Sequence, residues 1–173
     1  DLAQYHGYLV LLAVFAGRYF IYADFSGYTD IAIGAARLLG VSLPENFRRP
    51  FAASSIADYW RRWHITLQAW IRDYVFFPLA GSSVGAATGA YPLIFLTFAI
   101  LGAWHGLSWN FLLYGTWHAS FLVLHDLTRG PRLRLWDKLG LKESRLGSWL
   151  FAWGTFVFFV TPPTILFLTH APS

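Results

Sequence analysis

Long apolar segments alternate with short polar segments along this chain, and some of them are long enough to cross a bilayer. The first covers residues 5–25, and Arg18 and Asp24 interrupt only its second half, which we expect to face protein or lipid headgroups. Residues 25–30 combine a glycine with helix-capping side chains. We therefore expect a break there and a second helix that ends near Gly40.

The next helix in the pattern begins at Ser55 and runs toward Pro78. Two prolines predict a loop over residues 43–50 before it, and residues 55–58 resemble a capping box with aspartate in place of glutamate. On one continuous helix, five apolar side chains would share a face: Trp60, Trp63, Leu67, Trp70 and Ile71. This pattern predicts an amphipathic helix that lies along the membrane interface or dips into the protein.

Two further apolar helices are predicted over residues 91–104 and 109–124, after a loop of small residues at 80–89. Glycines and a serine surround His105, so we expect a break at this histidine, with the second helix beginning near Ser108. Broken helices occur at membrane depth where the backbone is buried in protein or lines a cavity.

The basic residues predict how these helices are oriented. No lysine or arginine lies between Arg72 and Arg129, whereas basic residues cluster on both sides of that gap. The positive-inside rule places both clusters on the cytoplasmic side, so the helices between them should cross outward and back. A last apolar span, residues 149–168, is broken by Pro162 and Pro163.

Composition fits this pattern: hydrophobic residues make up 56% of the chain and charged residues 13%, against about 25% charged in soluble domains. We expect an all-α fold, a polytopic membrane protein fragment with several transmembrane and re-entrant or interfacial helices in one membrane domain, residues 1–173. The fragment interpretation comes from a chain that begins at Asp1 and contains no methionine.

The absence of cysteine excludes disulfides, thiolate metal sites and a cysteine nucleophile within this segment. The net charge is +4, but the basic residues lie beside apolar helices, which is typical of segments that contact a lipid bilayer. We therefore expect the bilayer, and not a nucleic acid, to be the partner of these charges.

Two histidines are the leading candidates for chemistry. His64 and His105 lie among tryptophans in apolar surroundings, and ionisable groups in such places mark functional sites by default. A neutral imidazole in an apolar cavity can take a proton from a hydroxyl and later return it. The alternative is that His64 anchors the chain at the interface and His105 is a hydrogen-bonded packing residue.

Other patterns allow further roles. Arg61, Arg62 and Arg72 could hold a phosphorylated acyl donor, although arginines in such places also anchor headgroups. Residues 81–85 match the spacing of a hydrolase nucleophile elbow by chance, since no strand is expected before them. His118 and His125 are seven residues apart, which leaves open a bis-histidine haem carrier; packing is the other role.

Five motifs together closely resemble the membrane-bound O-acyltransferase family: residues 24–34 (DFSGYTDIAIG), 44–47 (PENF), 59–67 (YWRRWHITL), 72–74 (RDY) and 104–106 (WHG). The order and spacing of these motifs carry the resemblance. The nearest branch looks like the bacterial alginate O-acetyltransferase group, with the D-alanyl transferases of teichoic acids as a cousin. Residues 78–83 depart from the family pattern, because they lack its basic residue.

The resemblance implies a helical funnel in which an acyl group, here acetyl, passes from a thioester donor to a hydroxyl. It identifies His105 as the catalytic histidine and His64 as the second active-site histidine. It makes this chain the central and C-terminal part of the core, in a multi-pass protein of the bacterial inner membrane. The implied acceptor is an exported polysaccharide or cell-envelope glycan, with periplasmic partner proteins completing the transfer.

With that reaction in view, we assign substrate contacts to the tryptophans that would exclude water and to polar residues of the motifs: Trp60, Trp63, Trp104, Arg61, Arg62 and Asn46. No metal or other cofactor is expected beyond the acyl thioester, because the thioester is already activated and only proton removal is needed. The alternatives are teichoic-acid D-alanyl transfer and a non-enzymatic module for polysaccharide export.

Overall fold

The computed structural model describes residues 7–141 together with residues 144, 146, 147, 150, 154 and 163. The described part is all-α, as the sequence predicts, and contains no strand beyond one isolated bridge between Phe47 and Trp63. The long and medium helices are α1 (Gly7–Leu38), α6 (Ala90–His105), α7 (Trp109–Leu127) and α8 (Arg129–Lys138). Between α1 and α6 lie short elements: a 3-10 turn (Pro50–Ala52), α2 (Ile56–Trp60), α3 (Ile65–Ile71), a π-helical turn (Arg72–Phe76), α4 (Phe77–Ala80) and α5 (Ser83–Thr88).

Helix α1 is 32 residues long and is, within the described residues, the one helix long and apolar enough to cross a membrane. The break expected at residues 25–30 is wrong, because α1 continues through them. The hydroxyls of Ser26 and Thr29 donate to backbone carbonyls three residues earlier, at 3.4 and 2.9 Å, instead of capping a new helix. The predicted end near Gly40 is confirmed, since Gly40 has a φ of 76° two residues after the helix.

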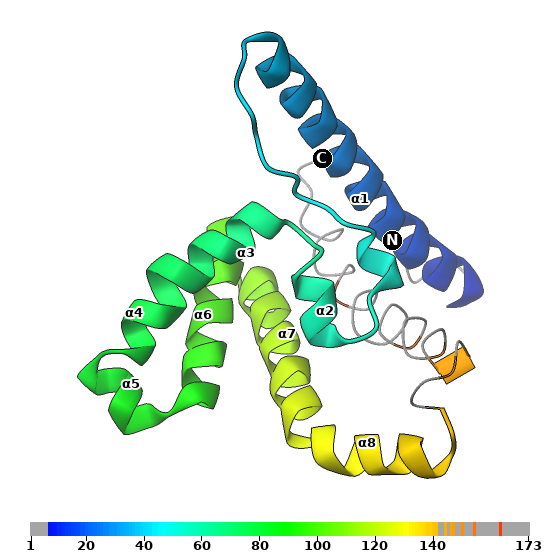
Figure 1. The fold of residues 1–173 in the computed structure, drawn as a ribbon, viewed down its shortest axis with the longest axis vertical. Helices are drawn as coiled ribbons and strands as arrows, with labels where there is room; N and C mark the ends of the chain where they lie inside the picture. Colours follow the sequence, from blue (N-terminus) through cyan, green and yellow to red (C-terminus); the bar gives the residue numbers. More distant parts are fainter. Residues whose placement is uncertain are drawn as a thin grey trace.

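The segment after α1 returns along the helix as an irregular loop, as the prolines predict (Figure 1). Ser55 then caps α2 and its hydroxyl accepts from the backbone N–H of Asp58 at 3.0 Å, which confirms the predicted helix start. The single helix expected from there to Pro78 is wrong. The chain leaves the helix after Trp60 and re-enters it at Ile65.

This interruption has a local cause in the preceding loop. Phe47 pairs with Trp63 as an isolated bridge, and the Arg48 N–H donates to the Arg62 carbonyl at 3.0 Å. The Ile65 N–H also donates to the Asn46 carbonyl at 3.0 Å, so the Arg62 carbonyl and the Ile65 N–H bond to the loop and not within a continuous helix. Between them, His64 adopts a left-handed φ of 47°. The tryptophan face expected on one helix is therefore divided.

Residues 83–88, which lie in a predicted loop, form helix α5 instead. The Ser82 hydroxyl accepts from the Gly85 N–H at 3.3 Å and also donates to the Leu79 carbonyl at 2.7 Å. This cap explains why a segment of small residues becomes helical. It also places residues 81–85 in a helical turn, with no strand before it.

Helices α6 and α7 form a hairpin (Figure 1). Helix α6 ends at His105 and α7 begins at Trp109, which confirms the break predicted there. Its two backbones touch at two glycines: a Cβ on Gly102 would lie 2.2 Å from the Phe111 carbonyl oxygen, and one on Gly115 would lie 2.2 Å from that of Phe98. Small residues at such crossings let helices pack closely where hydrophobic burial supplies no drive.

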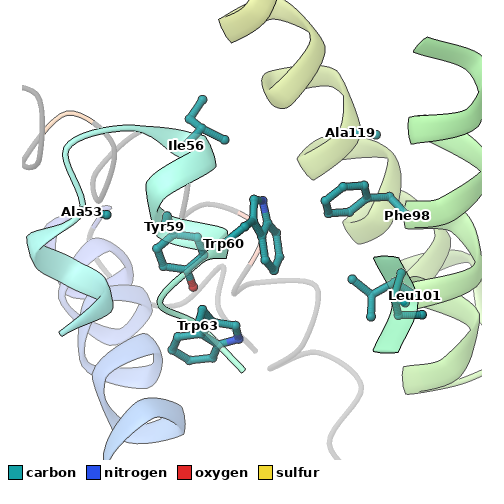
Figure 2. Packing of buried hydrophobic residues seen from close by; sticks show 9 residues of the cluster. Ala53, Ile56, Tyr59, Trp60, Trp63, Phe98, Leu101 and Ala119 are labelled. Carbon is teal, nitrogen blue, oxygen red and sulfur yellow. The ribbon is translucent and has the colours of Figure 1, made fainter. Parts of the chain in front are cut away.

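The core lies where α2 meets this hairpin. Figure 2 shows Trp60 pointing from α2 toward Phe98 of α6, with Tyr59 and Trp63 on the side that faces α1. Tyr59 is fully buried, and Trp60 and Trp63 are each less than a tenth exposed. By contrast, apolar side chains cover the outer face of α1, which suits contact with lipid. The predicted span 149–168 lies outside the described residues, apart from three single positions.

Candidate active site

A small cavity of about 70 Å³ lies between α1, the turn around His64, and the α6–α7 hairpin. Its lining combines aromatic and ionisable side chains: Arg18, Trp60, Trp63, His64, His105 and Tyr114. These residues are up to 96 positions apart in the chain, from Arg18 to Tyr114. The volume is sufficient for a few water-sized groups, such as the carbonyl end of an acyl chain.

His64 is held by the loop that interrupts the helix. Its Nδ1 lies 3.3 Å from the side-chain oxygen of Asn46, which also accepts from the Thr66 N–H at 3.2 Å and the Thr66 hydroxyl at 2.7 Å. Because that oxygen can only accept, Nδ1 carries the hydrogen and Nε2 is the basic nitrogen of the ring. Burial lowers the pKa of His64 below its ordinary value of 6.5, so the imidazole is neutral at pH 7.

Aromatic rings fix the plane of the His64 imidazole. The ring of Phe25 meets it edge-on with the centroids 4.8 Å apart, and Trp104 lies on another side at 6.2 Å. Trp104 also contacts His105, with 4.8 Å between ring centroids. One indole therefore touches both histidines.

His105 is the last residue of α6, at the turn of the hairpin. Its ring stacks on Phe111 at 6.0 Å and meets Tyr114 edge-on at 5.9 Å. A Cβ on Gly106 would come within 2.6 Å of the Phe111 ring, so only glycine lets Phe111 reach this position. The glycine after His105 thus serves the packing of the ring against which His105 stacks.

The cavity is also lined by a positively charged side chain, Arg18, which was not selected from the sequence as a site residue. Arg18 of α1 is 2% exposed, donates to the Tyr59 hydroxyl and places its guanidinium carbon 4.0 Å from the Trp63 ring centroid. Within the described residues it forms no salt bridge. The argument that selected the histidines, an ionisable group inside an apolar span, applies equally to Arg18.

The substrate-contact residues expected from the sequence fall into two groups. Trp60 and Trp63 line the cavity, whereas Trp104 is 58% exposed and only its contacts with the histidines link it to the site. Asn46 reaches the site through its bond to His64 and does not line the cavity itself.

Arg61 and Arg62, the two arginines of the tryptophan motif, do not line the cavity that contains His64 and His105. The Arg62 Nε donates to Asp58 at 2.9 Å, and Arg61 approaches the same carboxylate at 3.5 Å while lining a different pocket. Burial alone would raise the pKa of Asp58, but the bonds from Arg62 and from the Ser54 backbone lower it overall. Arg62 therefore bonds to α2 and the preceding loop, and Arg61 faces outward.

His118 and His125 lie in different surroundings, although they share α7. His118 is fully buried against Trp60 and Tyr114, with ring centroids 4.9 and 4.5 Å away. His125 is half-buried beside the guanidinium of Arg132. The packing role weighed for both is consistent with these contacts.

The chain is similar to known proteins over much of its length. The sequence model of the membrane-bound O-acyltransferase family matches residues 3–161. A probable alginate O-acetylase of Azotobacter vinelandii is 41% identical over 109 residues, which are 63% of this chain and 22% of that protein. A peptidoglycan O-acetyltransferase of Helicobacter pylori is 43% identical over 105 residues, 61% of this chain and 20% of that protein.

A third relative is similar over a longer stretch. The teichoic acid D-alanyltransferase of Streptococcus thermophilus is 30% identical over 150 residues, which are 82% of this chain and 36% of that protein. The chain thus spans between about a fifth and a third of the length of these curated relatives.

Proposed function

Because the chain belongs to the membrane-bound O-acyltransferase family, we propose that it is part of an enzyme that moves an acyl group from a thioester to a hydroxyl of a cell-envelope or exported glycan. The observation that carries this proposal is the position of His64 and His105. They come from separate segments, 41 residues apart, and line one small aromatic cavity. The acyl group proposed is acetyl, after the names of the two O-acetyl-transferring relatives.

In the proposed reaction, His105 accepts the proton of the acceptor hydroxyl, and the oxygen attacks the carbonyl carbon of the thioester. The carbon–sulfur bond then breaks, and the proton passes from the imidazole to the departing thiolate. His64 assists from the same cavity, since the Asn46 bond at Nδ1 leaves Nε2 as its basic nitrogen. General base catalysis of this kind contributes about 10²–10⁴-fold to a rate.

Arg18 supports the same step through its charge. Negative charge develops on the carbonyl oxygen as the hydroxyl adds, and a positive group fixed in a water-poor cavity stabilises that charge. Arg18 lines the cavity, and its guanidinium is held by Tyr59 and Trp63. Trp60 and Trp63 add apolar walls that exclude water, which would otherwise hydrolyse the donor.

The experiment that tests this function uses the full-length protein in lipid nanodiscs, a labelled acetyl thioester and a glycan acceptor. We expect label in an ester on the glycan that hydroxylamine releases. Label that appears only as free acetate, or not at all with any acyl thioester, would contradict the proposal.

D-alanyl transfer to a teichoic acid is the second candidate. It is favoured by the Streptococcus thermophilus relative, whose similarity extends over 82% of this chain. The same assay run with a D-alanyl thioester separates the two, because the preferred donor should give the higher kcat/KM. The proposed role of His105 as general base is the same for an acetyl and for a D-alanyl donor.

We also propose a multi-pass position in the bacterial inner membrane, with periplasmic partner proteins completing the transfer. The hairpin of α6 and α7 supports the outward-and-back path. Its sides are tested by single cysteines in a cysteine-free background of the full-length protein. A cysteine at Leu107, in the hairpin turn, should react with an impermeant maleimide in intact spheroplasts. A cysteine at Arg134 should react only after permeabilisation; the opposite pattern would reverse the orientation.

A further inference from the structure

A second pocket, of about 520 Å³, lies where the start of α2 meets the end of α7 and helix α8. Figure 1 shows α8 beginning at the end of α7 and running away from it along the lower edge of the molecule. The pocket is lined by residues from both basic clusters of the sequence, Arg61 from the first and Arg129 and Arg132 from the second. The fold therefore brings together cations that lie about 70 positions apart in the chain.

The side chains that line this pocket carry more positive than negative charge. Three arginines line it with one carboxylate, Asp126, which accepts a hydrogen bond from the Tyr91 hydroxyl at 3.0 Å. The side chain of Arg61 is 71% exposed and approaches Asp58 only at 3.5 Å, because Asp58 makes its closer bond to Arg62. The pocket is thus a positively charged recess.

Two of the cations lie together on the first turn of α8. Arg132 is half-buried, with its guanidinium nitrogens 3.0 and 3.2 Å from the ring of His125. Burial and repulsion from Arg129 lower the pKa of Arg132, and an anion between the two arginines would offset that repulsion. The indole of Trp136 forms an apolar wall beside them.

We propose that this pocket binds the phosphate of a phosphate ester, held by Arg61, Arg129 and Arg132. Guanidinium groups match phosphate oxygens bidentately, and basic recesses beside membrane helices are typical sites for anionic headgroups. The same chemistry is offered by two sources: the headgroup of an anionic phospholipid, and the phosphate of a soluble thioester carrier. This site lies apart from the histidine cavity, and its occupancy does not depend on acyl transfer.

The test compares four forms of the full-length protein: the native sequence, Arg129→Gln with Arg132→Gln, Arg61→Gln, and Arg134→Gln. Arg134 lies on the same helix, is exposed and does not line the pocket, so its variant loses a charge without touching the site. Arg61→Gln is a second pocket variant on a different element, which covers the case that changes in α8 disturb its helix.

Each source has its own arm. In the first, nanodiscs of phosphatidylcholine with or without phosphatidylglycerol are compared, and retained lipid is counted by native mass spectrometry. In the second, coenzyme A is titrated calorimetrically into the protein in phosphatidylcholine alone. In one of these two assays, we expect the native protein to bind the ligand. We expect its affinity to fall about tenfold or more in each pocket variant and to stay unchanged in Arg134→Gln.

A loss confined to the first arm identifies a lipid headgroup, and a loss confined to the second identifies a soluble carrier. Equal binding by the native protein, both pocket variants and Arg134→Gln in both arms would overturn the proposal. A loss of equal size in Arg134→Gln would also overturn it, because that result shows attraction to net charge and not a pocket.

Discussion

Gly102 and Gly115 are the positions at which α6 and α7 touch, so alanine at either position tests how this hairpin is built. A new Cβ would lie 2.2 Å from a carbonyl oxygen of the facing helix at both places, whereas ordinary contact begins at 3.4 Å. The obstructing atoms are backbone, which cannot rotate away as a side chain can. The helices must therefore separate by about 1 Å.

The cost of this separation is of the order found for overpacked interiors, about 1–3 kcal/mol per substitution. It is offset only in part by the gain of up to about 1 kcal/mol when alanine replaces glycine inside a helix. The two substitutions act on one interface, so the separation that the first causes makes room for the second. We expect the double variant to be less destabilised than the sum of the two single variants.

Gly34→Ala is the matched control, since Gly34 lies inside α1 with nothing within 4 Å of a new Cβ. The measurement is the free energy of unfolding of the full-length protein in detergent micelles, followed by circular dichroism. Gly34→Ala should be neutral or slightly stabilising, while Gly102→Ala and Gly115→Ala lose stability. If all three variants unfold alike, the close backbone approach of α6 and α7 is wrong.

Three other outcomes follow from the site. Asn46→Ala should lower the free energy of unfolding by about 1–2 kcal/mol and reduce acyl transfer, because Thr66 and His64 lose their shared acceptor; transfer equal to the native rate would contradict the positioning role. Burial keeps the pKa of His64 below 6.5, so the unfolded chain takes up a proton first as the pH falls. Stability should therefore fall below about pH 6.5 in a titration of unfolding, and His64→Gln should weaken that dependence. Arg18→Met should keep or raise stability, since burying a guanidinium without a carboxylate is costly, but should lower kcat for transfer. An unchanged kcat in a correctly folded Arg18→Met would refute its electrostatic role.

Local signals in the sequence predict several elements correctly. Ser55 caps α2, Gly40 follows the end of α1, and the small residues around His105 separate α6 from α7. Each of these features depends on side chains a few residues away, which is the range over which a single sequence is informative. The helical class follows from the same apolar periodicity.

Two features that the sequence did not predict have different causes, one local and one a contact between distant residues. Residues 25–30 carry break signals, yet the hydroxyls of Ser26 and Thr29 satisfy the preceding carbonyls and α1 continues. The left-handed turn at His64 requires pairing of Phe47 with Trp63, which no local pattern shows.

The candidate site was predicted in part. His64 and His105 were selected from their apolar surroundings, and the structure brings both to one cavity. Arg18 was noted only as an interruption of the first span, because its partners Tyr59 and Trp63 are more than 40 residues away. Their roles in catalysis stay predictions.

The central claim is that two histidines in one cavity carry out acyl transfer, and the most direct measurement is label transfer by His105→Ala and His64→Ala in the full-length protein. Leu107→Ala is the control, since Leu107 is two residues from His105 and 95% exposed. At equal membrane expression, we expect transfer to be lost in His105→Ala, strongly reduced in His64→Ala and unchanged in Leu107→Ala. Equal labelling by all four proteins, native included, would contradict the account and make the histidines packing residues.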